Sequence, residues 1–410
     1  MKFSLQTWLK ISLFNLVLVA LLGVVLRYKI SFSLPFINQK YLLEAHSHFA
    51  FDGWVTQALM SLLANNLSRK SNKPISQKYH WLLLGNLVAS LGMLIFFSIQ
   101  GYSICSIIFS TASIIVSYLF GIFYWRDLNS LPEKDVSCRC FKAAVLFNAL
   151  SSAGPFVLAY MMATKNYDQN LYLAAIYFFL HFQYNGWFFF SCMGLMFDHL
   201  IKYGIPEGKL KIGFNLFLSA CVPAYFLSAP WLQIPLWVYL LVVAAVFLQL
   251  ASWFILCRSI KNVMMEIKSE ISWFSQLLFS CSAVALSIKL LLQAATVIPS
   301  LSKLAFGFRP IVIAYLHLVL LGVITIFILS YMIAFKLISV NKTTIAGVAI
   351  FIAGIILNEI LLMIQGAADL DYYAIPWINE VLFGVAVVLL TGVVMINWGQ
   401  FMRSHYPVER

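Results

Sequence analysis

Charged residues are scarce in this chain. Only 10% of its 410 residues are Asp, Glu, Lys or Arg, whereas 62% are hydrophobic. A soluble domain carries about 25% charged residues, and so few charges cannot cover a water-facing surface of this size. The sequence therefore excludes a soluble globular protein, and it predicts a chain that lies almost entirely in a lipid bilayer, its first expected partner.

Alternating ten-residue strands, which would indicate a membrane barrel, are missing as well. The apolar runs are long instead, and a helix of roughly 20 residues crosses the hydrocarbon core. Backbone groups in lipid must be bonded within their own segment, so each run is expected to be a helix. We expect an all-α integral membrane protein of about twelve transmembrane helices, in a single domain over residues 1–410. The expected helices cover residues 11–27, 41–66, 80–100, 104–124, 141–163, 170–198, 211–228, 233–257, 271–295, 308–336, 344–366 and 376–400.

Positive charge is distributed unevenly along the chain, whose formal net charge is +12. In a soluble protein this balance would suggest nucleic acid as a partner, but Lys and Arg of membrane proteins collect in cytoplasmic loops. Most of the 27 Lys and Arg residues fall at the two termini and in the loops after even-numbered runs. The exceptions are Arg27, Lys29, Lys40, Lys165, Lys303 and Arg309 in the other loops, and Lys289 inside a run. This asymmetry predicts cytoplasmic N and C termini in a multi-pass protein of the inner (plasma) membrane, and we expect no nucleic-acid partner.

Histidines stand within the apolar runs, where ionisable residues are expensive and are functional candidates by default. His46 and His48 lie in the second run, His181 in the sixth and His317 in the tenth. All three runs enter from the outer face in the predicted topology, and at 1.5 Å per residue the histidines fall in the outer half of the membrane. Neutral imidazole binds metals and haem iron, so the pattern suggests a shared cofactor; scattered packing histidines are the alternative.

The second run offers two different faces. His46 and His48 are about 200° apart on a helix, so they cannot serve one iron together. Ala50 and Gly53 follow His46 on its own face, which would admit a flat macrocycle or simply let two helices approach closely. His48 and Asp52 are spaced i, i+4 and can hydrogen-bond on another face.

Three short motifs resemble those of one family, namely subunit I of the haem–copper oxidases and the large subunit of the related nitric oxide reductases. The stretch AHSHF at residues 45–49 is similar to the haem-ligating site of the family's second helix. HFQYNGW at 181–187 is similar to a metal-ligating stretch of its sixth helix, and YLH at 315–317 occupies the place of its tenth-helix His-x-His. The resemblance implies a cytochrome oxidase subunit I-like fold, with twelve helices and cytoplasmic termini.

The same resemblance implies a cofactor, one low-spin haem b with His46 and His317 as its axial ligands. It also implies that Tyr315 replaces the ligand of a second haem, and tyrosinate can ligate haem iron. His181 would be a ligand of the second metal; a hydrogen bond to a neighbouring helix is its alternative. The seventh run contains no histidine, whereas the family has a His-His pair there. An incomplete binuclear centre makes oxygen or nitric oxide reduction doubtful, which leaves electron transfer or sensing, with an electron-donor protein or other membrane subunits as partners.

Two basic residues lie near the level expected for the haem propionates, which must be paired or hydrogen-bonded when buried. Lys289 is a few residues below the outer end of its run, and Arg309 starts the run that contains His317. The alternative for Arg309 is an interfacial anchor. The alternative for Lys289 is a salt bridge with Glu359 or Asp52.

A secondary transporter is the rival interpretation, because about twelve helices in a chain of this length also suit that class. Asp52, Lys289 and Glu359 would then be intramembrane substrate or proton sites.

Overall fold

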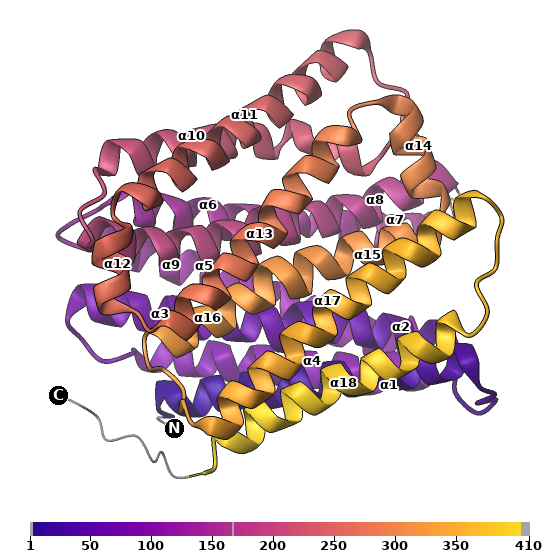
Figure 1. The fold of residues 1–410 in the computed structure, drawn as a ribbon, viewed down its shortest axis with the longest axis horizontal. Coiled ribbons are helices and arrows are strands. Elements are labelled where there is room, and N and C mark those ends of the chain that lie inside the picture. Colours follow the sequence, from indigo (N-terminus) through magenta and orange to yellow (C-terminus); the bar gives the residue numbers. More distant parts are fainter. Residues whose placement is uncertain (1–2, 166–167, 403–410) are drawn as a thin grey trace. The chain divides into compact units, whose positions relative to one another are not determined.

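The computed structural model describes residues 3–165 and 168–402, and every regular element in these ranges is a helix (Figure 1). Nine helices in the described ranges are long and apolar enough to cross a membrane. They are α1 (Leu5–Ser31), α4 (Gln77–Gln100), α5 (Ile104–Asn129), α6 with α7 (Val136–Thr164), α11 (Leu236–Asn262), α13 (Trp273–Ala295), α15 to α16 (Arg309–Ala334), α17 (Lys342–Leu370) and α18 (Ile378–Gly399). The protein is thus an all-helical, multi-pass membrane protein, as the sequence predicts.

The other three expected runs are also helical, but they are interrupted by irregular turns. They comprise α2 (Gln39–His48), η1 (Phe49–Thr56) and α3 (Gln57–Ser71); α8 (Gln169–His181), η2 (Phe182–Phe188) and α9 (Phe189–Lys202); and α10 (Glu207–Cys221) followed by the 3₁₀ helix η3 (Pro223–Ser228). Two short helices, α12 (Met264–Glu270) and α14 (Pro299–Gly307), lie in stretches that we expected to be loops. Pro299 starts α14, a position where proline's fixed φ suits a helix and its missing N–H costs nothing.

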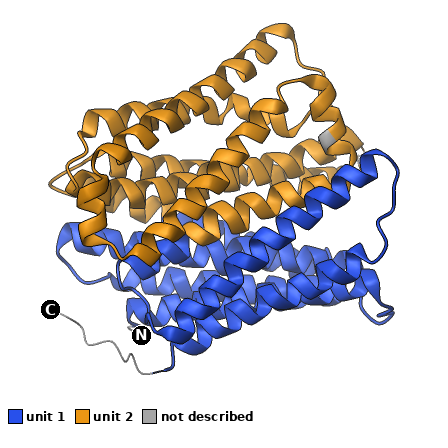
Figure 2. Cartoon of the chain, viewed as in Figure 1, with its two compact units in different colours: residues 1–120, 328–410 blue, residues 121–327 orange. Residues whose placement is uncertain are grey.

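The chain divides into two compact units, which are described separately (Figure 2). Unit 1 comprises residues 1–120 and 328–410, and unit 2 comprises residues 121–327. In unit 1, α17 packs closely against α18: a Cβ added to Gly347 would lie 2.7 Å from the Ile396 amide nitrogen and 2.8 Å from the Gly392 oxygen. Small residues of this kind let helices in lipid approach until their backbones touch.

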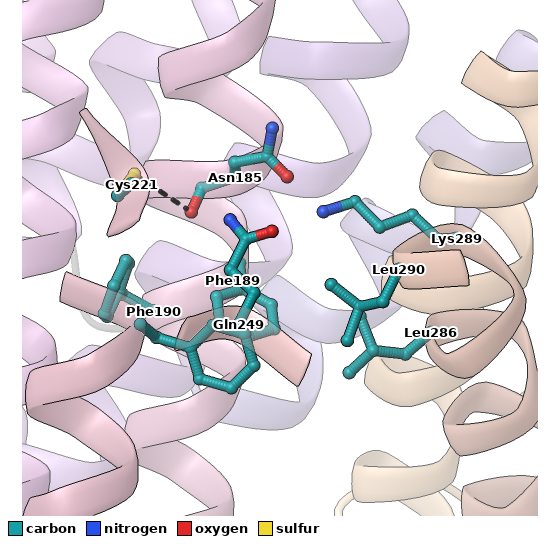
Figure 3. A pocket seen from close by; sticks show the side chains of 9 residues that line it. Asn185, Phe189, Phe190, Cys221, Gln249, Leu286, Lys289 and Leu290 are labelled. Atoms are coloured by element: carbon teal, nitrogen blue, oxygen red, sulfur yellow. Dashed lines mark hydrogen bonds between the residues drawn. The ribbon is translucent and has the colours of Figure 1, made fainter. Parts of the chain in front are cut away.

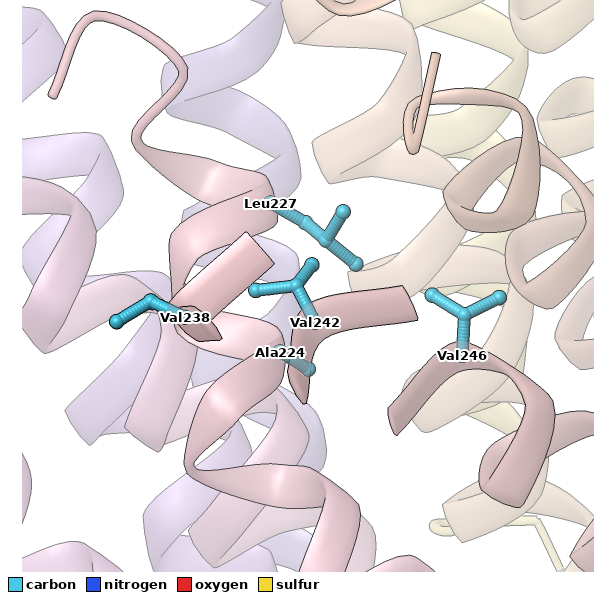
Figure 4. Close-up of a cluster of buried hydrophobic side chains, with 5 residues drawn as sticks. All are labelled: Ala224, Leu227, Val238, Val242 and Val246. Atoms are coloured by element: carbon cyan, nitrogen blue, oxygen red, sulfur yellow. The ribbon is translucent and has the colours of Figure 1, made fainter. Parts of the chain in front are cut away.

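In unit 2, an apolar cluster joins η3 to α11 (Figure 4). Ala224 and Leu227 of η3 are buried with Val238, Val242 and Val246 of α11. The three valines are four residues apart and therefore form one stripe on α11. This contact holds η3 against α11, while Pro223, which has no N–H to continue the α-helix, stands where α10 gives way to η3.

Three of the helical runs change to π-helical geometry directly after a histidine. The π segment η1 begins after His48, η2 begins after His181, and η4 (Leu318–Thr325) begins after His317. π-helices make up well under 1% of residues in globular proteins and frequently mark functional sites. The histidines in the sequence and the π segments in the backbone are thus two separate observations that point to the same three runs as candidate functional sites.

Each return from π to α geometry shifts the hydrogen-bond register by one residue, so a carbonyl is passed over. At the end of η1, the Gln57 amide donates to the oxygens of Asp52 and Trp54, and it skips that of Gly53. The Gly53 oxygen accepts instead from Asn15 Nδ2 on α1, at 2.6 Å. A side chain of a neighbouring helix therefore completes the backbone of the π segment.

The same device recurs in unit 2. The Asn185 oxygen of η2 accepts a long bond from the Cys221 thiol of α10, with Sγ at 3.7 Å. In η4 the Ile326 amide donates to the oxygens of Leu321 and Val323. The bond from Ser282 Oγ of α13 to the Val323 oxygen, at 2.8 Å, is therefore an additional bond to a carbonyl that its own helix already engages. Polar side chains inside these apolar runs thus serve the backbone of the π segments, as buried carbonyls require.

Candidate functional site

In unit 1, the two histidines of α2 point to different helices. The ring of His48 stacks on Phe97 of α4 with centroids 4.4 Å apart and planes 2° apart, and its Nε2 lies 3.3 Å from the Tyr102 hydroxyl. His46 is half-buried, and its Cε1 lies 3.5 Å from where a Cβ of Gly23 on α1 would be. His48 is therefore held by aromatic packing, while His46 faces a position on α1 that carries no side chain.

Asp52 has another partner than the one that its spacing suggests. Its carboxyl is hydrogen-bonded by Ser113 of α5, whereas His48 bonds Tyr102. The reason is the π segment, which begins between the two residues and turns less per residue than an α-helix does. The expected open face beside Gly53 is filled too, because a Cβ there would lie 2.5 Å from the ring of Phe49.

In unit 2, both ring nitrogens of His181 are engaged. Asn185 Nδ2 lies 3.1 Å from Nδ1, and the Cys221 carbonyl oxygen lies 2.8 Å from Nε2. Since an amide nitrogen only donates, Nδ1 accepts and Nε2–H donates, which describes a neutral imidazole. The hydrogen bond to a neighbouring helix, one of the two alternatives for His181, is thus present in the structure. Metal ligation by His181 would require one of these bonds to break.

Two tyrosines and a serine meet beside this histidine. The hydroxyls of Ser228 and Tyr315 lie near that of Tyr184, and the two tyrosine rings lie 6.4 Å apart at 73°. The centroid of Tyr184 is 6.3 Å from that of His181. Ser228 closes η3 in the stretch where the resembled family has its His-His pair. The structure therefore gathers His181 and Tyr315, which the sequence selected, around Tyr184.

His317 is half-buried at the end of α15, and its Nδ1 lies 2.9 Å from the oxygen of Ile313 one turn earlier. A carbonyl only accepts, so Nδ1 carries the hydrogen and Nε2 carries the lone pair. Metal-ligating histidines are commonly oriented by a bond of this kind from the other ring nitrogen. Arg309 is exposed at the first residue of α15, as an interfacial anchor would be.

Lys289 of α13 is only 5% exposed and lies beside a small cavity (Figure 3). The space open to the centre of a water molecule is about 10 Å³, close to the minimum that holds one water. The side chain extends toward Asn185 and Gln249, from η2 and α11 (Figure 3). Within the described part of unit 2, Lys289 has no hydrogen bond or ion pair. The cavity is lined by Asn185, Phe189, Phe190, Phe217, Cys221, Gln249, Leu286, Lys289 and Leu290.

The predicted axial pair stays a prediction, because His46 belongs to unit 1 and His317 to unit 2. Among the residues that the structure describes, no group of three or more His, Cys, Asp or Glu side chains is placed to hold a metal ion. A bis-histidine haem takes only two protein ligands, so that finding does not bear on it.

Sequence reasoning missed the amide and thiol side chains that complete these sites. Asn15, Gln249 and Cys221 were not selected, although each stands inside an apolar run. The signal was present, because a buried amide must find hydrogen-bond partners. Only ionisable residues were weighed as exceptions to the apolar pattern.

No family model matches the chain, and no curated protein is significantly similar to it. The fold defines a class, that of all-helical multi-pass membrane proteins. The resemblance to the oxidase family stays an expectation from the sequence, which rests on the three histidine motifs and on the predicted helix count and order.

Proposed function

We propose that the protein is an inner-membrane cytochrome that holds one low-spin haem b and acts in electron transfer or sensing. In this proposal about twelve helices cross the membrane, both termini are cytoplasmic, and an electron-donor protein or other membrane subunits are the partners. The carrying observation is that the runs with His48, His181 and His317 each change to π-helix directly after the histidine. π segments frequently mark functional sites, and the family-like motifs fall on the same three runs.

His46 and His317 are the residues that would hold the haem iron, which when bound would supply one-electron transfer. The hydrogen bond from His317 Nδ1 to Ile313 fixes the ring and leaves the lone pair on Nε2. His46 is the better ligand of its pair, because His48 is stacked on Phe97 and bonded to Tyr102. The bond that orients His317 lies within unit 2.

Arg309 is the better placed of the two proposed propionate partners. It starts the helix that carries His317, and its guanidinium suits bidentate contact with a carboxylate. Lys289 extends into the cavity beside Asn185 instead (Figure 3).

The proposal does not include reduction of oxygen or nitric oxide at a second metal. His181 uses both ring nitrogens in hydrogen bonds. Ser228, at the end of η3, lies in the stretch where the family's other ligands would stand. Turnover of either gas by the purified protein, abolished by His181→Ala, would contradict this part.

The test is the optical spectrum and haem content of the purified full chain, with three histidine variants. We expect sharp low-spin bands in the wild type, and loss of haem or of the low-spin signature in His46→Ala and His317→Ala. His48→Ala is the matched control, two residues from His46, and it should keep the bands. A colourless wild type would refute the cytochrome, and bands lost in His48→Ala but kept in His46→Ala would refute the ligand assignment.

A secondary transporter is the second candidate, favoured by two ionisable residues inside apolar runs, the half-buried Asp52 and the buried Lys289. Asp52 lies in the π segment η1 with Ser113 as its partner, and Lys289 lies in the cavity of unit 2. Both are typical of intramembrane substrate or proton sites. A colourless protein whose solute uptake in proteoliposomes is abolished by Asp52→Asn would favour this function.

A further inference from the structure

Glu359 is an acidic residue near the middle of α17, a helix of 29 residues that is long and apolar enough to cross a membrane. Its side chain is half-buried, and its carboxylate accepts a hydrogen bond from Nδ2 of the neighbouring Asn358, at 3.1 Å. Within the described part of unit 1, Glu359 has no ion pair. A carboxylate offers about four acceptor sites, and an ionisable residue at this depth is expensive unless it is paired.

The described part of unit 1 offers no cation at the depth of Glu359. Lys289 of unit 2 is a basic residue inside another apolar run, and its side chain extends toward Asn185 and Gln249 of its own unit (Figure 3). A counter-charge for Glu359 would therefore come from another molecule. The Lys and Arg residues of unit 1 in the described ranges stand in loops or near the ends of helices, at Lys10, Arg27, Lys29, Lys40, Arg69, Lys70, Lys73, Lys78, Lys336 and Lys342.

Two faces of α17 have different surroundings. Gly354 faces α18, since a Cβ added to it would lie 2.8 Å from the side chain of Leu389. The opposite side, about 200° around the helix, carries an exposed stripe whose residues alternate in steps of four and three, the spacing of a seam between two packed helices. Glu359 borders this stripe, three residues after Ile356 and four before Met363. The stripe consists of Ala349, Ala353, Ile356, Ile360, Met363 and Ala367.

We propose that this exposed stripe binds a transmembrane helix of a partner subunit, and that the helix carries a Lys or Arg at the depth of Glu359. Lipid would suffice for an apolar stripe, so the carboxylate is what selects a helix with a cation. A second copy of this chain does not fit, because residues on one flank of a parallel seam meet those on the other flank of the partner. The other flank here is formed by Leu357 and Ile364, which are exposed and apolar. The inference rests on the part of the proposed function that names membrane subunits as partners, and it needs no haem.

The experiment measures binding of a synthetic transmembrane helix to the full chain in lipid vesicles. The probe is a peptide of roughly 20 leucines and alanines with one central lysine and a dansyl group, and a twin peptide has leucine in place of the lysine. Energy transfer from the 11 tryptophans of the chain to the dansyl group reports binding. We expect the lysine peptide to bind the wild type about tenfold more tightly than its twin, near the upper limit measured for polar contacts between membrane helices.

Three variants assign this preference to Glu359 and to the stripe. Glu359→Leu should remove the preference for the lysine peptide. Glu380→Leu is the matched control, because it removes the same charge from the first turn of α18 and should leave the preference intact. Ile360→Trp keeps the carboxylate but fills the stripe, so it should weaken binding of both peptides.

Equal binding of the two peptides by the wild type would overturn the proposal, and so would a preference that survives Glu359→Leu. Dimers of the wild type that dissociate in Glu359→Leu, measured by light scattering, would assign the stripe to a second copy and overturn it too. The haem bands are recorded in the same samples. A colourless protein that prefers the lysine peptide supports this inference and refutes the cytochrome, whereas a protein with haem bands and no preference does the reverse.

Discussion

The hydrogen bond from Asn15 to the Gly53 oxygen gives the sharpest test of how the π segments are held. In η1 the regular ladder passes over that oxygen, and Asn15 Nδ2 is its donor at 2.6 Å. Asn15→Leu keeps a γ-branched side chain but removes the donor. The Gly53 oxygen is then a buried carbonyl without its partner, which costs about 1–3 kcal/mol.

The magnitude separates this account from ordinary helix packing. Hydrogen bonds between side chains of membrane helices average only about 0.6 kcal/mol, because the reference state finds other partners. A backbone carbonyl skipped by its own helix has no other partner in lipid, so the loss in Asn15→Leu should exceed about 1 kcal/mol. The assay is reversible unfolding in mixed detergent, read as the free energy of unfolding.

Ser12→Ala is the matched control on the same helix. Ser12 is as buried as Asn15, but its hydroxyl donates to Trp8, a carbonyl of its own helix, at 2.9 Å. Such bonds contribute little to helix stability, so we expect a change within about 0.5 kcal/mol. A loss in Asn15→Leu no larger than that in Ser12→Ala would refute the reasoning.

Two further predictions, one in each unit, are tested by the same assay. Gly347→Ala should cost about 1–3 kcal/mol because its Cβ would meet the backbone of α18, whereas Gly384→Ala on α18, where a Cβ has open space, should be neutral or stabilising by up to about 1 kcal/mol. A similar loss in both would exclude close backbone contact as the cause. His181→Leu should cost about 2–4 kcal/mol, since Cys221 and Asn185 each lose a buried hydrogen bond; a cost below about 1 kcal/mol would mean that these bonds are dispensable.

The helices were predictable because the thickness of the bilayer sets their length. The expected runs 80–100 and 271–295 correspond closely to α4 (Gln77–Gln100) and α13 (Trp273–Ala295). Hydropathy reports only whether a segment prefers lipid, so it gives no sign of π geometry within an apolar run. The short helices α12 and α14 were missed for the opposite reason, since they lie in stretches too short or too polar to span a membrane.

The sequence allowed the ionisable residues of the candidate sites to be predicted, but not the residues to which they are hydrogen-bonded. His181 and Lys289 were selected because a charge or imidazole is costly in lipid. Tyr315 was selected because it stands in the family-like YLH motif, and unit 2 contains all three residues. Their hydrogen bonds connect residues far apart in the sequence, such as His181 with Cys221, and no periodicity reports such pairs. The i, i+4 spacing of His48 and Asp52 suggested a hydrogen bond between them only if the helix stays α-helical from 48 to 52. The π segment η1 starts at Phe49, within that interval.

The π segments also affect how the chain tolerates changes in length. A π segment is equivalent to one extra residue inserted in an α-helix, which turns everything beyond it by about 100°. Deleting a single residue within Phe49–Thr56 would let the segment relax to α geometry, and the side chains of α3 would then rotate relative to His46. The direction in which each histidine points, relative to the helix that follows it, thus depends on the one extra residue in the π segment. We therefore expect insertions or deletions in these runs to be more disruptive than substitutions.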